Sequence, residues 1–106
     1  MVKQKLRAGV IGCGVGASHA YAYAKAPEYE LAAVCDISSE VIDRLWERAR
    51  LEPGSVRTYR DYKEMLDKED LDVVSVAVPD DLHADPVCDA SNAGVKGVLC
   101  EKPLCI

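Results

Sequence analysis

The chain has 106 residues, of which 49% are hydrophobic, so it is long enough for one globular domain with a core of its own. Its formal net charge is -5 at pH 7 and its basic residues are scattered among acidic ones, which argues against DNA or RNA as a partner. No apolar stretch approaches the roughly 20 residues that cross a bilayer, and the segment 1–5 lacks the apolar core of a signal peptide. We therefore expect a cytoplasmic protein without a membrane-spanning segment.

Apolar runs of strand length alternate with segments of helical period, a pattern that is typical of an α/β fold with a parallel sheet. In the first half of the chain the expected elements are a strand at 5–11, a helix at 16–26 that Pro27 ends, a strand at 30–35, and a helix from Ser38 or Ser39 to about Leu51. The strand at 30–35 does not alternate between polar and apolar residues, so we expect both of its faces to be buried. One apolar stripe along the second helix should belong to the core: Ile42, Leu45, Trp46 and Ala49.

The second half of the chain continues the same alternation. Its expected elements are a strand at 56–58, a helix at 61–68, a strand at 72–78, a helix that begins near Pro86 and ends before Gly94, and a strand at 97–100. Right-handed crossovers then place the five strands in the order 3-2-1-4-5, which is a Rossmann-type doubly wound parallel sheet. Ligands of such sheets bind at the carboxyl ends of the strands, beside the reversal between strands one and four.

A glycine-rich turn, GCGVGA at 12–17, follows the first expected strand. Gly12 permits a tight turn, and the absence of a Cβ at Gly14 lets a pyrophosphate lie against the backbone. Either Gly16 or Ala17 then lets the next helix pack close to the strand. Because the amides at a helix N-terminus attract phosphate, we expect a dinucleotide to bind along Gly12, Gly14, Val15, Gly16 and Ala17.

Asp36 ends the second expected strand, about twenty residues beyond the glycines. A carboxylate at that position accepts hydrogen bonds from the adenosine ribose and repels a 2′-phosphate, so Asp36 favours NAD over NADP. No arginine directly follows it in the sequence, which supports a role of Asp36 at the cofactor. The alternative role for Asp36 is to cap the turn that follows the strand.

Several segments match a known family, and the last of them is the most specific. They are Ile11-Gly12-Cys13-Gly14 with the nearby His19, Asp61-Tyr62-Lys63-Glu64-Met65-Leu66, Val78-Pro79-Asp80-Asp81-Leu82-His83, and Ala93-Gly94 leading into Val98-Leu99-Cys100-Glu101-Lys102-Pro103-Leu104. Over essentially its whole length the chain resembles the N-terminal domain of the Gfo/Idh/MocA oxidoreductases. Two departures stand out: the stretch from Gly14 to His19 is one residue shorter than usual, and the chain stops at Ile106, where these enzymes continue into a second α/β domain that supplies most substrate contacts. We therefore expect residues 1–106 to be the dinucleotide-binding domain, with the C-terminal substrate domain absent from this chain.

The resemblance implies roles for residues near the ends of the fourth and fifth expected strands. It places Lys102 near the nicotinamide and the substrate hydroxyl, where an ammonium aids proton transfer, so Lys102 is the expected catalytic residue; the alternative is a solvated lysine. Glu101 would hold the cofactor ribose or orient Lys102, although a surface carboxylate fits nearly as well. Asp80 and Asp81 would flank the loop at the nicotinamide ribose, although a helix-entry role for both is the safer interpretation. Histidine titrates near neutral pH, which makes His83 a candidate acid or base. The resemblance favours a structural role instead, because the matching position in the family looks structural. The resemblance extends the cofactor-binding set to Val78, Pro79, Asp80, His83, Glu101, Lys102 and Pro103.

The five cysteines include no CxxC pair and lie in or beside apolar runs. We expect reduced thiols that serve as small core residues, with Cys13 and Cys105 as the two that could be exposed and oxidisable. His19 is expected to be packed or bonded to the backbone. With only two histidines in the chain, we expect no metal site.

The function expected from these features is hydride transfer between NAD and the carbinol carbon of a sugar, inositol or related polyol, with NADP as the less favoured cofactor. On this view the 106-residue chain binds the nucleotide but hardly turns over. The alternative is a stand-alone NAD-binding regulatory module without catalysis, since a Rossmann fold alone does not imply chemistry. A methyltransferase is a more distant alternative, because that class does not explain the motif Glu101-Lys102-Pro103. The open sheet edge beyond the fifth strand predicts self-association into a homo-oligomer.

Overall fold

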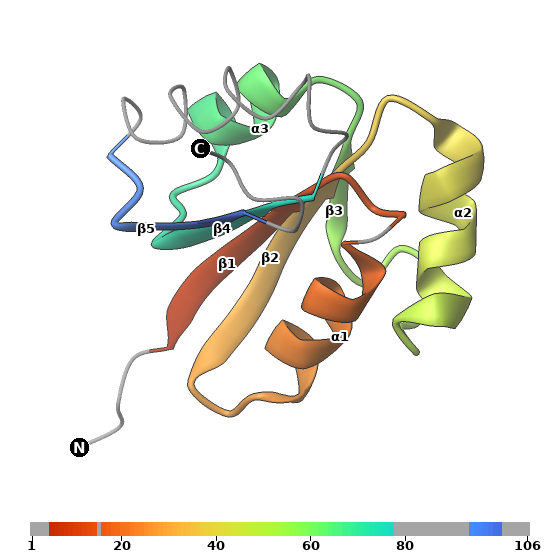
Figure 1. Ribbon diagram of the computed structural model, residues 1–106, viewed down its shortest axis with the longest axis horizontal. Helices are drawn as coiled ribbons and strands as arrows, with labels where there is room; N and C mark the ends of the chain where they lie inside the picture. Colours follow the sequence, from red (N-terminus) through yellow and green to blue (C-terminus); the bar gives the residue numbers. More distant parts are fainter. Residues whose placement is uncertain (1–4, 15, 78–93, 101–106) are drawn as a thin grey trace.

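The computed structural model describes residues 5–14, 16–77 and 94–100, which form one five-stranded parallel sheet and three helices (Figure 1). The elements in chain order are β1 (Leu6–Ile11), α1 (Ala17–Lys25), β2 (Tyr29–Cys35), α2 (Ser39–Arg48), β3 (Arg57–Tyr59), α3 (Tyr62–Lys68), β4 (Val73–Val76) and β5 (Gly97–Cys100). The strands are ordered β3-β2-β1-β4-β5 and every neighbouring pair is parallel, which confirms the predicted order and the doubly wound class. The helix expected near Pro86 lies outside the described residues, whereas Gly94 has a φ of +89°, as predicted for the residue after that helix.

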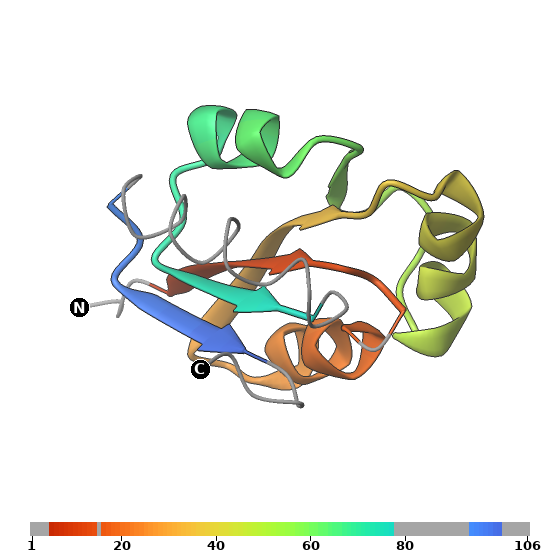
Figure 2. The same ribbon diagram turned by 45° about the horizontal axis from the view of Figure 1, so that its top comes forward.

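Helices cover both faces of the sheet, as Figures 1 and 2 show: α1 and α2 lie on one face and α3 lies on the other. The core on the α1 side contains Val10, Cys13, Ala17, Ala20, Val34, Ile42, Leu45 and Ala49. The core on the α3 side contains Ile11, Ala33, Cys35, Met65, Leu66, Leu71, Val74 and Val76. Successive residues of the central strands thus alternate between two cores, so only the strand ends are left for contact with a ligand. None of the helices in the described part of the chain has the length and apolarity that a membrane crossing requires.

Side-chain caps fix where two of the described helices begin. Ser38 caps α2, because its Oγ accepts a hydrogen bond from Val41 N at 3.3 Å. The sequence left Ser38 and Ser39 as alternatives, and the structure assigns the cap to Ser38. Asp61 caps α3 in the same way, and its carboxylate accepts a hydrogen bond from Lys63 N at 2.9 Å.

Two details of the predicted core differ from the structure. The prediction that the strand at 30–35 is buried on both faces was wrong for its first half, where Glu30 is exposed and Leu31 and Ala32 are half-buried. β3 has only three residues and pairs only with 33–35, so the first half of β2 lies at the edge of the sheet. Before Ala33, the outer edge of β2 is not paired with any strand in the described part of the chain. Trp46 packs against the α1-side core but remains half-buried, whereas the other members of its predicted stripe are buried.

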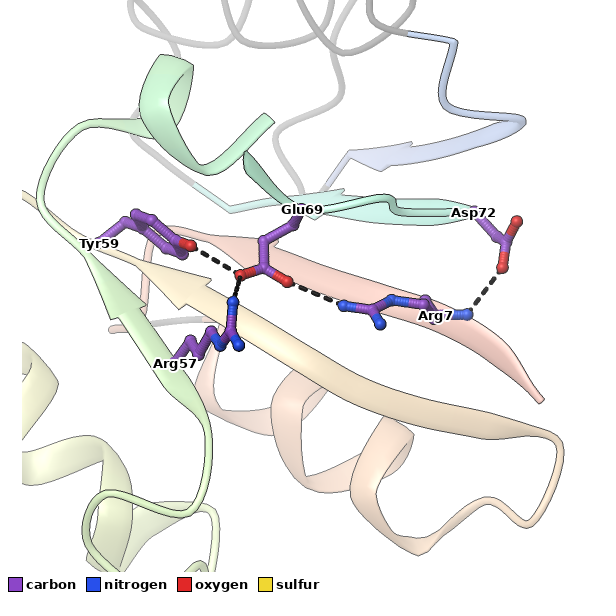
Figure 3. Close-up of polar contacts among 5 residues, drawn as sticks. All are labelled: Arg7, Arg57, Tyr59, Glu69 and Asp72. Carbon is purple, nitrogen blue, oxygen red and sulfur yellow. Dashed lines mark hydrogen bonds and ion pairs between the residues drawn. The ribbon is translucent and has the colours of Figure 1, made fainter. Parts of the chain in front are cut away.

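Toward the amino ends of the strands, a buried carboxylate joins several elements (Figure 3). The Glu69 side chain is 1% exposed and accepts hydrogen bonds from Arg7 Nη2 at 2.8 Å, Arg57 Nη1 at 3.3 Å and Tyr59 Oη at 2.6 Å. Arg7 also donates its backbone amide to Asp72 Oδ2 at 2.8 Å. These contacts tie β1 and β3 to the connection between α3 and β4.

Candidate functional site

The turn that follows β1 lies at the carboxyl edge of the sheet, where β1 and β2 end side by side (Figure 1). Gly12 has a φ of +92°, a conformation in which a residue with a Cβ is strained. The Gly12 amide donates a hydrogen bond to the Cys35 carbonyl at 2.7 Å. The chain therefore bends sharply here while it stays bonded to the end of β2.

Gly14 and Gly16 meet opposite steric requirements within this turn. A Cβ on Gly16 would lie 2.0 Å from the carbonyl oxygen of Gly12 and 2.7 Å from Val10 Cγ1, so only glycine lets α1 begin this close to β1. The close-packing role that the sequence left open between Gly16 and Ala17 therefore belongs to Gly16. A Cβ on Gly14 would meet nothing within 4 Å, so this part of the turn faces open space.

The beginning of α1 is electrostatically suited to an anion. α1 has nine residues, its N-cap is Gly16, and it has neither a side-chain cap nor an acidic residue in its first turn. By contrast, Ser38 and Asp61 cap α2 and α3. The partial positive charge at the N-terminus of α1 is therefore not offset by a carboxylate in the first turn of the helix. A phosphate group suits that environment.

Asp36 directly follows β2 and links the glycine turn to α2. Its Oδ2 accepts a hydrogen bond from Cys13 N at 2.8 Å, and its Oδ1 accepts one from Ser38 N at 2.9 Å. The second bond confirms that Asp36 caps the turn after the strand, and the first places the same carboxylate against the glycine turn. Because a carboxylate has about four acceptor positions, each oxygen can still accept a ribose hydroxyl.

The two cysteines beside this turn are buried, free thiols. Cys13 is 0% exposed and Cys35 is 2% exposed, and the Cys13 thiol donates a hydrogen bond to the Cys35 carbonyl at 3.4 Å. Burial, followed by the nearby Asp36 carboxylate, raises the pKa of each thiol from 9.0 to about 12. The prediction that Cys13 could be exposed and oxidisable was wrong, because its side chain belongs to the α1-side core.

His19 anchors α1 to the centre of the sheet. Its Nδ1 lies 3.0 Å from Ser75 Oγ, and Tyr23 Oη, one turn further along α1, lies 2.7 Å from the same hydroxyl. Ser75 belongs to β4 and is 0% exposed, so its hydroxyl depends on these partners for hydrogen bonds. His19 therefore connects α1 to β4 through a side-chain hydroxyl, whereas the sequence predicted packing or a bond to the backbone.

Within the described ranges, no three His, Cys, Asp or Glu side chains gather as the ligands of a metal ion would. A groove of about 420 Å³ lies at the opposite edge of the sheet and has balanced charge. Its charged lining residues are Arg7, Arg57 and Lys68 against Glu30, Glu69 and Asp70. An anion is therefore better served by the beginning of α1 than by this groove.

The structure brings part of the predicted site together at one edge. Gly12, Gly14, Gly16, Ala17 and Asp36 all belong to the ends of β1 and β2 or to the start of α1. β4 and β5 run parallel to β1, so their carboxyl ends point to the same edge. The other predicted site residues lie outside the described ranges: Val15, Val78, Pro79, Asp80, His83, Glu101, Lys102 and Pro103.

One residue at this edge was missed by the sequence reasoning. Arg60 directly follows β3, and its Nε donates a hydrogen bond to the Ile37 carbonyl at 2.7 Å. The residue that follows Asp36 in the sequence is Ile37, so adjacency in sequence alone places no positive charge beside the carboxylate. A signal was available, because residues that follow neighbouring parallel strands leave the sheet at the same edge.

A parallel sheet in this order, a glycine turn that leads into an uncapped helix, and a carboxylate at the end of β2 define a dinucleotide-binding Rossmann domain. The chain belongs to the Gfo/Idh/MocA oxidoreductases: the model of this oxidoreductase family, with its NAD-binding Rossmann fold, matches residues 6–106. This match confirms the family resemblance, and with it the NAD-binding oxidoreductase class.

Curated relatives with similar sequences include two dehydrogenases. The chain is 33% identical over 103 residues to an inositol 2-dehydrogenase of Salmonella typhimurium. The matched region covers 95% of this chain and 30% of that protein. The chain is 35% identical over 106 residues to a levoglucosan dehydrogenase of Pseudarthrobacter phenanthrenivorans, with 95% and 27% covered. It is also 34% identical over 107 residues to an alpha-N-acetylgalactosaminidase of Shewanella oneidensis, with 95% and 23% covered. The chain thus spans less than a third of the length of these relatives.

Solved structures give the same fold. The scyllo-inositol dehydrogenase of Lactobacillus casei with bound NAD(H) and scyllo-inositol has a TM-score of 0.79 and 25% identity, and covers 94% of this chain and 28% of that chain. A variant of a 3-ketoreductase of Actinomadura kijaniata in complex with TDP-benzene and NADP has a TM-score of 0.74 and 33% identity, with 95% and 31% covered. Both nicotinamide dinucleotides therefore occur among the structural neighbours of this domain.

Proposed function

We propose that this chain is the dinucleotide-binding domain of an NAD-dependent dehydrogenase that acts on the CH–OH group of a sugar, inositol or related polyol. The observation that carries the proposal is the joint placement of Asp36 and the glycine turn. The Asp36 carboxylate holds the Cys13 amide at 2.8 Å, so the acidic group and the open backbone at Gly14 form one surface. That surface matches the two parts of an adenine dinucleotide that such folds bind, the ribose and the pyrophosphate.

The described residues fit NAD in three places. The open backbone at Gly14 accommodates the pyrophosphate, and the uncapped start of α1 favours its negative charge. The unused acceptor positions of Asp36 receive the hydroxyls of the adenosine ribose. The negative charge of Asp36 also disfavours a 2′-phosphate, so NAD is the favoured cofactor. The proposed set also includes Gly12, Val15, Gly16, Ala17, Val78, Pro79, Asp80, His83, Glu101, Lys102 and Pro103.

The proposed reaction is the oxidation of a secondary alcohol. NAD, when bound, supplies the hydride acceptor for such a reaction. In the proposal, Lys102 is the catalytic residue and accepts or relays the proton of the substrate hydroxyl. Relatives named for inositol and levoglucosan support a polyhydroxylated ring as the substrate class.

We further propose that the protein self-associates and is cytoplasmic. Leu99 in the edge strand β5 is 54% exposed, which leaves an apolar side chain beside a strand edge that no other strand of the described ranges pairs with. Such an edge favours pairing with another copy.

Titration calorimetry with NAD tests the binding part of the proposal on the 106-residue chain. We expect saturable binding that Asp36→Ala weakens about tenfold, because the ribose loses a charged hydrogen-bond acceptor. Glu47→Ala is the matched control, since it removes an exposed carboxylate of α2. The proposal fails if the folded chain binds NAD no better than its Asp36→Ala variant does.

A further inference from the structure

Arg60 is brought to the proposed cofactor site by the sheet and not by the sequence. β3 pairs with β2 so that Tyr59 lies beside Cys35. The Asp36 amide then donates a hydrogen bond to the Tyr59 carbonyl at 3.1 Å. Arg60, the next residue, therefore leaves the sheet beside Asp36 although 24 positions separate the two in sequence.

The Arg60 side chain is held in place but keeps its charge available. Its Nε donates to the Ile37 carbonyl at 2.7 Å, which fixes the guanidinium along the segment that follows Asp36. Within the described part of the chain this is the one hydrogen bond that the Arg60 side chain makes, and Arg60 is exposed. A guanidinium has five N–H donors, so its terminal nitrogens can still bind an anion in a forked geometry.

The charges around Arg60 leave room for this role. The neighbouring carboxylate of Asp61 is turned toward its own helix, where it accepts a hydrogen bond from Lys63 N at 2.9 Å. Asp36 is bonded to two backbone amides, and neither of its oxygens is paired with Arg60 in the structure. The carboxylate of Asp36 and the guanidinium of Arg60 therefore bind the peptide group between Ile37 and Ser38 from its two sides, and neither group neutralises the other through a direct contact.

We infer that Arg60 is a specificity-determining residue that binds the 2′-phosphate of NADP, so that this chain binds NADP as well as NAD. The inference rests on the proposed cofactor site, because the adenosine ribose must lie against Asp36. Asp36 repels a 2′-phosphate and Arg60 attracts it. The ratio of the two affinities is set by this pair and not by Asp36 alone, so the preference for NAD is narrower than the sequence indicates.

The test measures the dissociation constants of NAD and NADP by calorimetry on the 106-residue chain and on three variants. Arg60→Ala should weaken NADP binding about fivefold to tenfold and change NAD binding less than about twofold. Arg60→Gln should behave in the same way, because it keeps a donor for the Ile37 carbonyl but removes the charge. Arg48→Ala is the matched control, since Arg48 is an exposed arginine at the far end of α2, and both affinities should be unchanged.

Two further readouts separate the charge effect from packing. Adenosine 2′,5′-bisphosphate should lose affinity in Arg60→Ala, whereas ADP should not. Salt should weaken NADP binding to the unaltered chain more than to the variant. The inference is overturned if Arg60→Ala weakens NAD and NADP equally, which would indicate adenine stacking or support of the Ile37 segment, or if it changes neither. Absence of NAD binding to the unaltered chain would overturn the proposed function instead.

Discussion

The Asp36 carboxylate accepts a hydrogen bond from the backbone amide of Cys13 at 2.8 Å, which joins the end of β2 to the glycine turn after β1. The same carboxylate accepts a second hydrogen bond from Ser38 N at 2.9 Å. One side chain therefore positions the turn, the start of α2 and the proposed ribose contact. A substitution there is expected to affect both stability and cofactor choice.

Asp36→Asn separates these two effects. The amide keeps one acceptor oxygen but places a donor against one of the two backbone N–H groups, so the free energy of unfolding should fall by about 1 kcal/mol. Removal of the charge should narrow the difference between the dissociation constants of NAD and NADP about tenfold. Denaturant titration and calorimetry measure the two quantities. An unchanged affinity ratio in Asp36→Asn and Asp36→Ala would exclude Asp36 from the ribose site.

Gly16→Ala should lower the stability of the fold, whereas Gly14→Ala should weaken NAD binding, although each variant adds one methyl group. At Gly16 the methyl would lie 2.0 Å from a backbone carbonyl, so α1 must shift and we expect a loss of about 1–3 kcal/mol in the free energy of unfolding. At Gly14 nothing lies within 4 Å, so stability should be kept while NAD binding weakens, because the methyl occupies the proposed pyrophosphate position. Thermal denaturation and NAD titration of both variants check this pair. Equal effects of the two variants on NAD affinity, in folded protein, would contradict the assignment of Gly14.

The alternation of strands and helices made the sheet order predictable, because each βαβ unit has one favoured hand. The placement of Gly12 and Asp36 at one edge of the sheet was predictable for a similar reason, since it depends on their positions at strand ends. The orientation of Cys13 was not, because its side chain follows the backbone that Gly12 and Gly16 impose on the turn. Arg60 was missed because its position beside Asp36 depends on the pairing of β2 with β3.

Glu69 is expected to stabilise the fold without affecting the cofactor site. Glu69→Ala leaves Arg7, Arg57 and Tyr59 without their shared acceptor (Figure 3). Because the Arg7 and Arg57 side chains are 39% and 74% exposed and can be rehydrated, we expect a loss of about 1–3 kcal/mol, below that for a fully buried pair.

A matched carboxylate serves as the control for Glu69. Glu64 pairs with Lys68 at 3.5 Å on the exposed side of α3, so Glu64→Ala should cost less than about 0.5 kcal/mol. Urea titration gives both values, and NAD affinity should be unchanged in both variants, since Glu69 lies toward the opposite edge of the sheet. Equal stability losses would show that the burial of Glu69 contributes nothing.

Leu99 is expected to mediate self-association. It pairs in register with Ser75, whose hydroxyl contacts His19 and Tyr23 of α1, so Leu99 lies on the α1 face of the sheet. Leu99→Lys should shift the chain toward the monomer in sedimentation velocity, because it places a charge at the exposed edge strand. The analogous change at Leu6, which is 40% exposed at the start of β1, should leave the distribution unchanged. A monomer at all concentrations of the unaltered chain would contradict the prediction.

The two buried thiols should make the fold less stable above pH 9. Each thiol has its pKa raised from 9.0 to about 12 in the folded chain, so the folded state keeps its proton where the unfolded state has lost it. This contribution to stability is fully present below about pH 9 and is lost as the pH rises toward 12. The pKa of Tyr59 is also raised, by its hydrogen bond to Glu69, so its contribution to stability is likewise lost as the pH rises.

Urea titrations from pH 8 to about 10.5 should therefore show a steeper decline in the free energy of unfolding for the unaltered chain than for a Cys13→Ala, Cys35→Ala double variant. Mass spectrometry after thiol alkylation at pH 8 should find both thiols unmodified until urea unfolds the chain. Equal pH slopes in the two chains, or rapid alkylation of Cys13 in the folded state, would show that its thiol does not lie in the core.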